Sequence, residues 1–226
     1  MMKTPAQRHY EQVTAQLAAA SAAADGSASM AGSSAYELMM VKLHADRRRL
    51  KSVQSVERKV DVKRELLPDY VEYVDGVLDG GRGAQDEVLV TVMTWRIDVG
   101  DFAGALEIAG YALEHGLTMP DHFDRPLATV LAEEISDRAL EAIKAEQPVD
   151  VQLLLEVAKL TDPIDMHDQV RAKQYKALGL AQQSDPATAL PFLERAVQLF
   201  DRVGVKQDIA RLQKQLDGGE KEDATT

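Results

Sequence analysis

The chain has no cysteine and few aromatic residues, and these absences limit what it can be. Without cysteine among its 226 residues it has neither a disulfide nor a thiolate metal site, as expected in a reducing compartment. No stretch approaches the roughly 18 consecutive apolar residues of a membrane span. The N-terminal region lacks the apolar core of a secretory signal. A membrane protein and a disulfide-stabilised secreted protein are therefore not expected.

Small and aliphatic residues dominate what is present. Apolar residues make up 45% of the chain and aromatic residues only 5%, which is typical of closely packed helices with a sizeable core. No alternation typical of strands is visible, so the sequence predicts an all-α fold. We expect four segments: a mobile N-terminal segment and linker at 1–34, a basic helical region at 35–82, a helical-hairpin domain at 83–216 and a disordered acidic tail at 217–226.

The stretch from Gly83 to Pro120 reads as two helices joined by a tight turn at Val99-Gly100-Asp101. After the turn, GDFAGALEIAGYAL has the small-residue spacing of a tetratricopeptide-like hairpin. A second, looser hairpin is expected at 167–202. Because a solenoid usually needs three or more stacked repeats, the sequence predicts a compact array of about two such hairpins.

A long helix is expected from Tyr36 to Val60, and it carries most of the positive charge. The window from Lys42 to Arg64 has nine basic and three acidic residues, a net charge of +6, against −17 for the rest of the chain. The basic residues are Lys42, Arg47, Arg48, Arg49, Lys51, Arg58, Lys59, Lys63 and Arg64. On a continuous helix Arg47, Lys51 and Arg58 would form one stripe.

A basic stripe of this kind suits the phosphate backbone of DNA, because each cation that neutralises a phosphate releases a counterion. We therefore take all nine residues as the candidate DNA-binding set within 35–82, a region that could also serve oligomerisation. Two alternatives stay open. The stripe is a solvated face, or it pairs with the acidic surface of a neighbouring subunit.

Candidates for metal chemistry are weaker. Glu87 and Asp98 are about 16 Å apart along a helix, too far to share one ion, and Asp86 and Asp101 are expected to stabilise helix N-termini. The fragment Asp121-His122-Phe123-Asp124 is expected to be a surface loop. The glycines from Gly80 to Gly83 lack the Lys-Ser/Thr ending of a P-loop. The sequence thus assigns no catalytic residue, metal ligand or cofactor.

Several segments resemble one protein family. TPAQRH, YELMMVKLHADRRRLK, KRELLPDYVEYVDGVL, the Gly83–Pro120 stretch and VRAKQYKALGL together are similar to the small terminase subunits of Peduovirus-type tailed phages. The resemblance covers roughly Thr4–His9 and Tyr36–Leu212. Relatives often end in a long tail rich in Lys, Arg and Pro. This chain ends in a short acidic tail, which places more weight on the basic region for DNA contact.

The resemblance implies a function. Such a subunit would recognise the cohesive-end site of concatemeric viral double-stranded DNA and, with a large ATPase subunit, direct cutting and packaging into the procapsid. It also implies a homo-oligomer, with a ring as one form, acting in the host cytoplasm. The family is called the terminase endonuclease subunit, but no catalytic motif can be placed here. Two alternatives therefore stay open: a metal-dependent endonuclease using Mg²⁺, and a helical adaptor that binds only protein.

Overall fold

The computed structural model describes residues 3–24, 30–81, 83–120 and 124–223. Within these ranges the elements are all helical, which confirms the all-α prediction. The chain divides into two compact units, Met1–Leu127 and Ala128–Thr226. The boundary falls inside the segment that the sequence assigns to one helical-hairpin domain.

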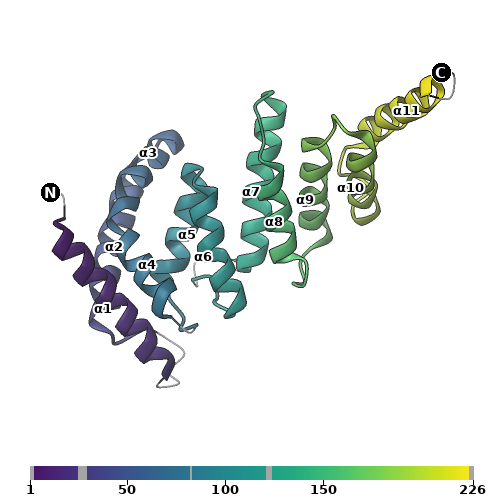
Figure 1. Cartoon of the computed structure of the whole chain (residues 1–226). Coiled ribbons are helices and arrows are strands. Elements are labelled where there is room, and N and C mark those ends of the chain that lie inside the picture. Colours follow the sequence, from purple (N-terminus) through teal and green to yellow (C-terminus); the bar gives the residue numbers. More distant parts are fainter. Residues whose placement is uncertain (1–2, 25–29, 82, 121–123, 224–226) are drawn as a thin grey trace. The chain divides into compact units, whose positions relative to one another are not determined.

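In the described residues of the first unit there are six α-helices and one 3₁₀ turn. They are α1 (Pro5–Ala24), α2 (Ser34–Ser52), α3 (Val56–Leu66), η1 (Leu67–Asp69), α4 (Val71–Gly80), α5 (Glu87–Val99) and α6 (Phe102–Glu114) (Figure 1). Helix α5 is the centre of this unit, because Val88, Leu89, Val92, Met93 and Ile97 are all buried. The remaining helices of the unit position the site around it.

The turn between α5 and α6 lies where the sequence places it. Gly100 adopts a left-handed conformation with φ of 83°, which only glycine takes without steric cost. Asp101 caps the next helix by accepting the backbone N–H of Gly104 at 3.2 Å. Local turn chemistry therefore makes this helical hairpin. Its tetratricopeptide-like character stays a prediction.

The prediction of a single long helix from Tyr36 to Val60 is wrong. Val53 is extended, with φ of −92° and ψ of 128°, so α2 ends at Ser52. Ser55 then caps α3, its hydroxyl accepting the backbone N–H of Arg58 at 3.2 Å. The physical reason is that serine caps compete with helix continuation beside β-branched Val53. The break gives α3 its own direction and divides the basic residues between two helices.

Helix α1 packs closely against α4, which differs from the loose attachment expected for the N-terminal segment (Figure 1). Ala15 and Ala19 are buried, and the backbones approach at Gly76 and Gly80. A Cβ on Gly76 would lie only 2.3 Å from the carbonyl oxygen of Gln12, so no larger residue fits without movement. Of the linker expected at 26–34, residues 26–29 lie outside the described residues.

The part of the second unit that the structure describes is built from five helices: α7 (Leu127–Lys144), α8 (Val151–Thr161), α9 (Asp168–Ala181), α10 (Pro186–Leu199) and α11 (Lys206–Asp223). Helices α9 and α10 pack closely where Gly179 faces Leu193. Leu212 of α11, together with Val205 just before this helix, is buried in one cluster with Leu190 and Leu193 of α10. Helix α11 runs beyond the end at residue 216 that the sequence predicts.

A polar network joins α8 to α9. The guanidinium of Arg171 donates to the carbonyl oxygens of Thr161 and Ile164 at 2.8 and 2.9 Å and to the Thr161 hydroxyl at 3.2 Å. Buried Gln174 donates to the same hydroxyl at 3.1 Å. The network adds a charged donor to the last carbonyl of α8, that of Thr161, which also accepts the backbone N–H of Ile164 at 3.1 Å.

Replacing Arg171 with Met should therefore lower the free energy of unfolding of the second unit by about 2–3 kcal/mol, because buried acceptors lose charged donors. Urea denaturation followed by circular dichroism measures this. Arg195 is the control, since it is exposed and its side chain donates to Gln198 on its own helix, with no other partner among the described residues. If Arg171→Met and Arg195→Met shift the transition equally, the network does not stabilise the fold.

Candidate nucleic-acid interface

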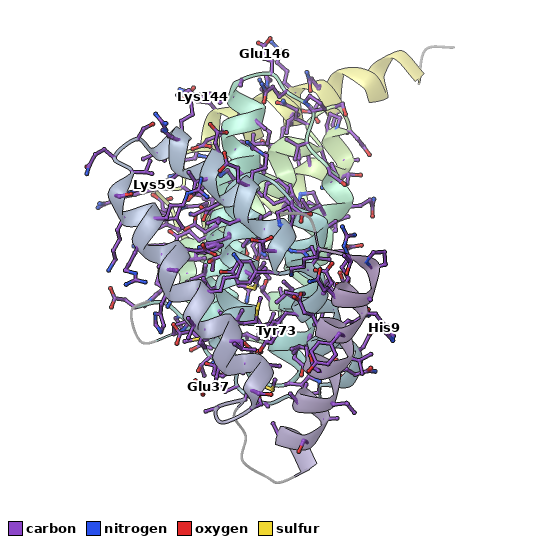
Figure 2. All side chains as sticks on the ribbon, turned by 90° about the vertical axis from the view of Figure 1, so that its left-hand side faces the viewer. His9, Glu37, Lys59, Tyr73, Lys144 and Glu146 are labelled. Carbon is purple, nitrogen blue, oxygen red and sulfur yellow. The ribbon has the colours of Figure 1, made fainter. Side chains whose placement is uncertain are left out.

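A basic groove of about 920 Å³ lies between α2, α3 and α5 in the first unit. Five of the nine candidate DNA-binding residues line it: Arg47, Arg48, Lys51, Lys59 and Lys63. The remaining lining residues are Val41, His44, Leu50, Thr91 and Trp95. No acidic residue occurs among these lining residues in the described part of the chain. Figure 2 looks toward α1–α3, with Lys59 labelled on α3.

Thr91 and Trp95 of α5 line the back of this groove, and they belong to one stripe of that helix. Glu87, Thr91, Trp95 and Asp98 follow each other at helical spacing along a single face. At one end Glu87 binds Arg47 of α2 at 2.5 Å, and at the other Asp98 binds Lys63 of α3. Thr91 also accepts a hydrogen bond from Arg47 at 2.8 Å. The two acids thus attach both neighbouring helices to α5.

The predicted cations fall into two groups. Five are held by carboxylates of the same chain, namely Lys42, Arg47, Arg49, Lys63 and Arg64. Four have no ion pair with any residue that the structure describes, namely Arg48, Lys51, Arg58 and Lys59. Arg48, Lys51 and Arg58 are exposed and Lys59 is half-buried. Because exposed, unpaired cations are the ones that can reach phosphates, the second group is the stronger candidate.

The helix break changes the geometry of the predicted stripe. Arg47 and Lys51 lie on α2, Arg58 lies on α3, and the chain bends at Val53 between them. The prediction that Arg47, Lys51 and Arg58 form one stripe is therefore wrong. What replaces it is a groove with basic residues on two facing helices, Arg48 and Lys51 on one and Lys59 on the other.

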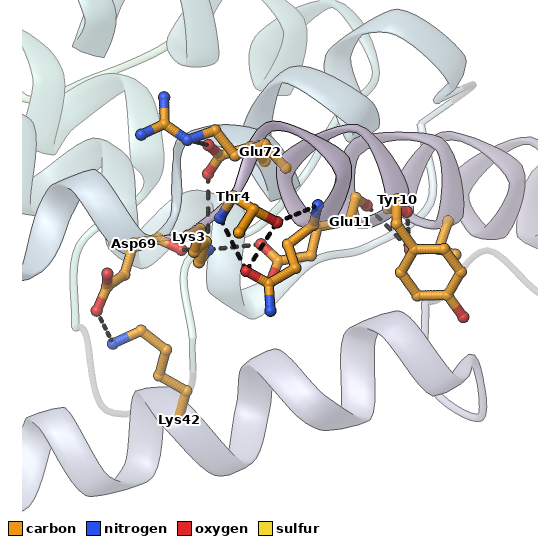
Figure 3. A network of polar contacts seen from close by, with 10 residues as sticks. Lys3, Thr4, Tyr10, Glu11, Lys42, Asp69 and Glu72 are labelled. Carbon is orange, nitrogen blue, oxygen red and sulfur yellow. Dashed lines mark hydrogen bonds and ion pairs between the residues drawn. The ribbon is translucent and has the colours of Figure 1, made fainter. Parts of the chain in front are cut away.

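Lys42 belongs to a structural network instead (Figure 3). Its ammonium binds Asp46 and Asp69, each at 2.9 Å, and lies 4.9 Å from the centre of the Tyr70 ring. The Tyr70 hydroxyl donates to buried Asp46 at 2.7 Å. Burial by itself lowers the pKa of Lys42, but the bonds to Asp69 and Asp46 outweigh it and raise the pKa. Lys42 thus stabilises the fold through its two ion pairs, and its charge is already neutralised within the chain.

The same network reaches α1. Lys3 donates to the backbone carbonyl of Asp69 at 3.0 Å and binds Glu11 at 2.5 Å (Figure 3). Arg8 binds Glu72 of α4 at 3.4 Å. These contacts attach the start of α1 to the segment that follows α3.

The acidic residues considered for metal binding have structural partners. Asp86 caps α5, and Asp101 caps α6, as the sequence predicts. Glu87 and Asp98 are held by groove cations. Within the described residues no three His, Asp or Glu side chains gather in a way that could hold a metal ion. The fragment at 121–123 lies outside the described residues.

Asp86 is fully buried and has a perturbed acidity. Burial raises the pKa of its carboxyl to about 6, although hydrogen bonds from Tyr73 at 2.6 Å and from the Leu89 N–H at 2.9 Å act in the opposite direction. The folded protein therefore holds this proton more tightly than the unfolded chain, where the ordinary pKa is near 3.8.

The raised pKa of Asp86 makes the free energy of unfolding depend on pH. The contribution of Asp86 to stability is fully present below about pH 4 and is lost as the pH rises through 6, by about 3 kcal/mol. Asp86→Asn keeps the cap and carries no charge, so this loss should vanish. Urea unfolding of both proteins between pH 4.5 and 8 measures the difference. Parallel profiles for the two proteins would show that Asp86 does not titrate in this range.

Comparison with known proteins gives the family. The model of the phage small terminase subunit family matches residues 40–169, more than half of the chain. The chain belongs to the phage small terminase subunits. The resemblance read from the sequence is thereby confirmed, and membership indicates a role in phage DNA packaging within the infected host cell.

Two relatives of this small terminase subunit show how far the similarity extends. It is 48% identical over 217 residues to the "Terminase, endonuclease subunit" of Escherichia phage P2, covering 95% of this chain and 86% of the relative. It is 26% identical over 192 residues to the "Probable terminase, endonuclease subunit" of Haemophilus phage HP1, covering 78% of this chain and 68% of the relative. No solved structure matches the chain.

The family match includes every residue that lines the basic groove, from Val41 to Trp95. Sequence reasoning found the groove cations but missed Val41 and His44 of α2. Trp95 also borders the groove, although its side chain is buried. Among the described residues, no helix is both long and apolar enough to cross a membrane.

Proposed function

We propose that this small terminase subunit recognises the cohesive-end site of viral DNA concatemers and directs a large ATPase subunit to it. Together the two subunits would cut the DNA and load it into the procapsid. The observation that carries the DNA-binding part is the basic groove, whose cations Arg48, Lys51 and Lys59 have no carboxylate partner in the described part of the chain.

The charge of the whole chain makes this groove more informative. With a net charge of −11, the protein as a whole repels a polyanion. DNA contact would therefore be restricted to the basic groove and would weaken steeply with salt. Exposed Arg58, at the start of α3, would add a contact outside the groove.

A gel-shift titration with duplex DNA carrying the viral end site tests the proposal. We expect retention at low salt and loss as the salt concentration rises, with tighter binding to the end site than to unrelated DNA of equal length. The large subunit should bind the complex and not free DNA ends alone. Salt-independent binding to the large subunit, with no DNA retention at any salt, would favour the protein-only adaptor.

The second candidate is a metal-dependent endonuclease, which the names of both relatives favour. In that case the purified protein nicks end-site DNA in Mg²⁺ without its partner. Cleavage that occurs only after the large subunit is added would place the activity in the complex.

The tetratricopeptide-like hairpins would hold partners, among them the large subunit and further copies of this chain. We expect a homo-oligomer, with a ring as one form, working in the host cytoplasm. Native mass spectrometry with and without end-site DNA measures the number of copies. A monomer under both conditions would contradict the oligomer.

A further inference from the structure

The chain changes direction between α2 and α3, and this α2–α3 corner (residues 52–58) presents its side chains to solvent (Figure 1). Only the side chain of Val53 is half-buried. Val56 is 75% exposed, the highest value among the large hydrophobic residues in the described part of the chain. One exposed apolar residue is ordinary by itself, so its neighbours decide what the corner can bind.

Free positive charge gathers around the same corner. The four candidate cations without an ion pair among the described residues all lie between positions 48 and 59, and they are Arg48, Lys51, Arg58 and Lys59. Lys59 is labelled beside the corner in Figure 2. A duplex whose phosphates are held by these cations would therefore lie directly against the α2–α3 corner.

Reading a base sequence needs donors and acceptors that the protein does not use itself. Two corner hydroxyls are used: Ser52 donates to the Arg49 carbonyl oxygen at 2.7 Å, and Ser55 accepts the Arg58 N–H at 3.2 Å. The amide of Gln54 is exposed and has no hydrogen bond with any residue that the structure describes. A glutamine amide can bind both N6 and N7 of an adenine in the major groove.

Glu57 favours base edges over phosphates at this corner. The other two acids of α3 have partners, because Asp61 binds Arg64 and Glu65 binds Arg49. Glu57 is exposed and has no ion pair within the described residues. A phosphate would repel its carboxylate, whereas the amino group of a cytosine can donate a hydrogen bond to it.

We propose that the α2–α3 corner enters the major groove of duplex DNA, where Gln54, Val56 and Glu57 contact base edges. The major groove admits a helix and displays thymine methyl groups, which an exposed valine can contact. Val56 and Glu57 belong to the first turn of α3, the part of a recognition helix that meets base edges. The inference rests on the proposed end-site recognition and adds the residues that determine the preferred sequence.

A charge-neutral double variant, Gln54→Ala with Val56→Ala, separates base contacts from phosphate contacts. Its affinity for unrelated duplex should stay within about twofold of the wild type, because phosphate contacts are unchanged. Its preference for end-site over unrelated duplex should fall on the order of tenfold or more. Fluorescence anisotropy with the full chain and two duplexes of equal length measures both quantities.

The matched control combines Val71→Ala with Gln207→Ala, which truncate an exposed valine and an exposed glutamine elsewhere in the chain. This control should keep the full preference for the end site. Circular dichroism melts establish that both double variants are folded, as expected for changes at exposed positions.

Two further measurements isolate single contacts. Wild-type protein should bind an end-site duplex with uracil in place of thymine several-fold more weakly than the natural duplex, whereas Val56→Ala should bind the two equally. Glu57→Ala should bind unrelated duplex more tightly, because a negative charge is removed, and should prefer the end site less. A surface that binds only phosphates would instead gain affinity for both duplexes alike.

The outcomes separate the inference from the proposed function. An unchanged end-site preference in the Gln54→Ala and Val56→Ala double variant would overturn the inference and leave end-site recognition standing. An equal loss of affinity for both duplexes would also overturn it, since the corner would then contact only the DNA backbone. If wild-type protein binds the two duplexes equally, both the inference and end-site recognition fail.

Discussion

Reversing the charge of Arg48, Lys51 and Lys59 together should reduce duplex DNA binding by this small terminase subunit on the order of 100-fold or more near 0.1 M salt. The three side chains line the basic groove and have no ion pair among the described residues, so their charge is available to phosphates. The loss should be similar for end-site and unrelated DNA, because phosphate contacts carry no sequence information.

The salt dependence of the DNA affinity shows whether these three residues contact phosphates. Each phosphate contact that is lost should lower the slope of log affinity against log salt by about one. Fluorescence anisotropy across a salt series measures both affinity and slope. The matched control reverses Lys144, Lys159 and Lys214, which are exposed in the second unit and make the same change in net charge. Equal losses in both triple variants would mean that net charge, not the groove, governs binding.

Arg47 is a poor choice for this experiment, although the sequence places it in the stripe. It binds Glu87 at 2.5 Å and Thr91 at 2.8 Å. Placing a carboxylate there would bring two acids together and would detach α2 from α5. A loss of DNA binding would then report on folding.

The second large effect concerns the attachment of α1. Gly76→Val should release α1 from α4 and lower the free energy of unfolding by about 3 kcal/mol. A Cβ at this position would lie 2.3 Å from the Gln12 carbonyl oxygen and 2.8 Å from the Ala15 Cβ, both of which belong to α1. Backbone cannot yield as a flexible side chain does, so the whole helix must move.

Gly110 of α6 supplies the control. A Cβ on Gly110 meets nothing within 4 Å, so Gly110→Ala should stabilise the protein by about 0.5–1 kcal/mol through helix propensity. Limited proteolysis followed by mass spectrometry detects the release, since cleavage within residues 5–33 should become much faster in Gly76→Val. Unchanged cleavage and an unchanged melting temperature would show that α1 does not depend on this close approach.

Local signals in the sequence were enough to predict much of the fold. Gly100 and Asp101 mark the turn between α5 and α6, because a left-handed glycine and an aspartate cap act within a few residues. Pro68 likewise lies in the 3₁₀ turn that separates α3 from α4. The break at Val53 has no glycine or proline to mark it. Two serines and a β-branched residue were the only signals.

The site could be predicted in composition but not in arrangement. The nine cations are visible in the sequence, yet which of them are free depends on tertiary contacts. Arg47 meets Glu87 and Lys63 meets Asp98 across 40 and 35 residues of chain. Periodicity within one helix says nothing about such pairs, so the sequence could not separate structural cations from available ones.

The two ion pairs at the ends of α5 have a consequence for the energetics of binding. Arg47 fixes α2, and Lys63 fixes α3, to one buried helix. The basic groove is thus preorganised, so binding DNA would not require the free-energy cost of ordering α2 and α3. Association should accordingly proceed with little rearrangement of the protein backbone. The conformational entropy lost on binding would then come mainly from the few side chains that become ordered against DNA.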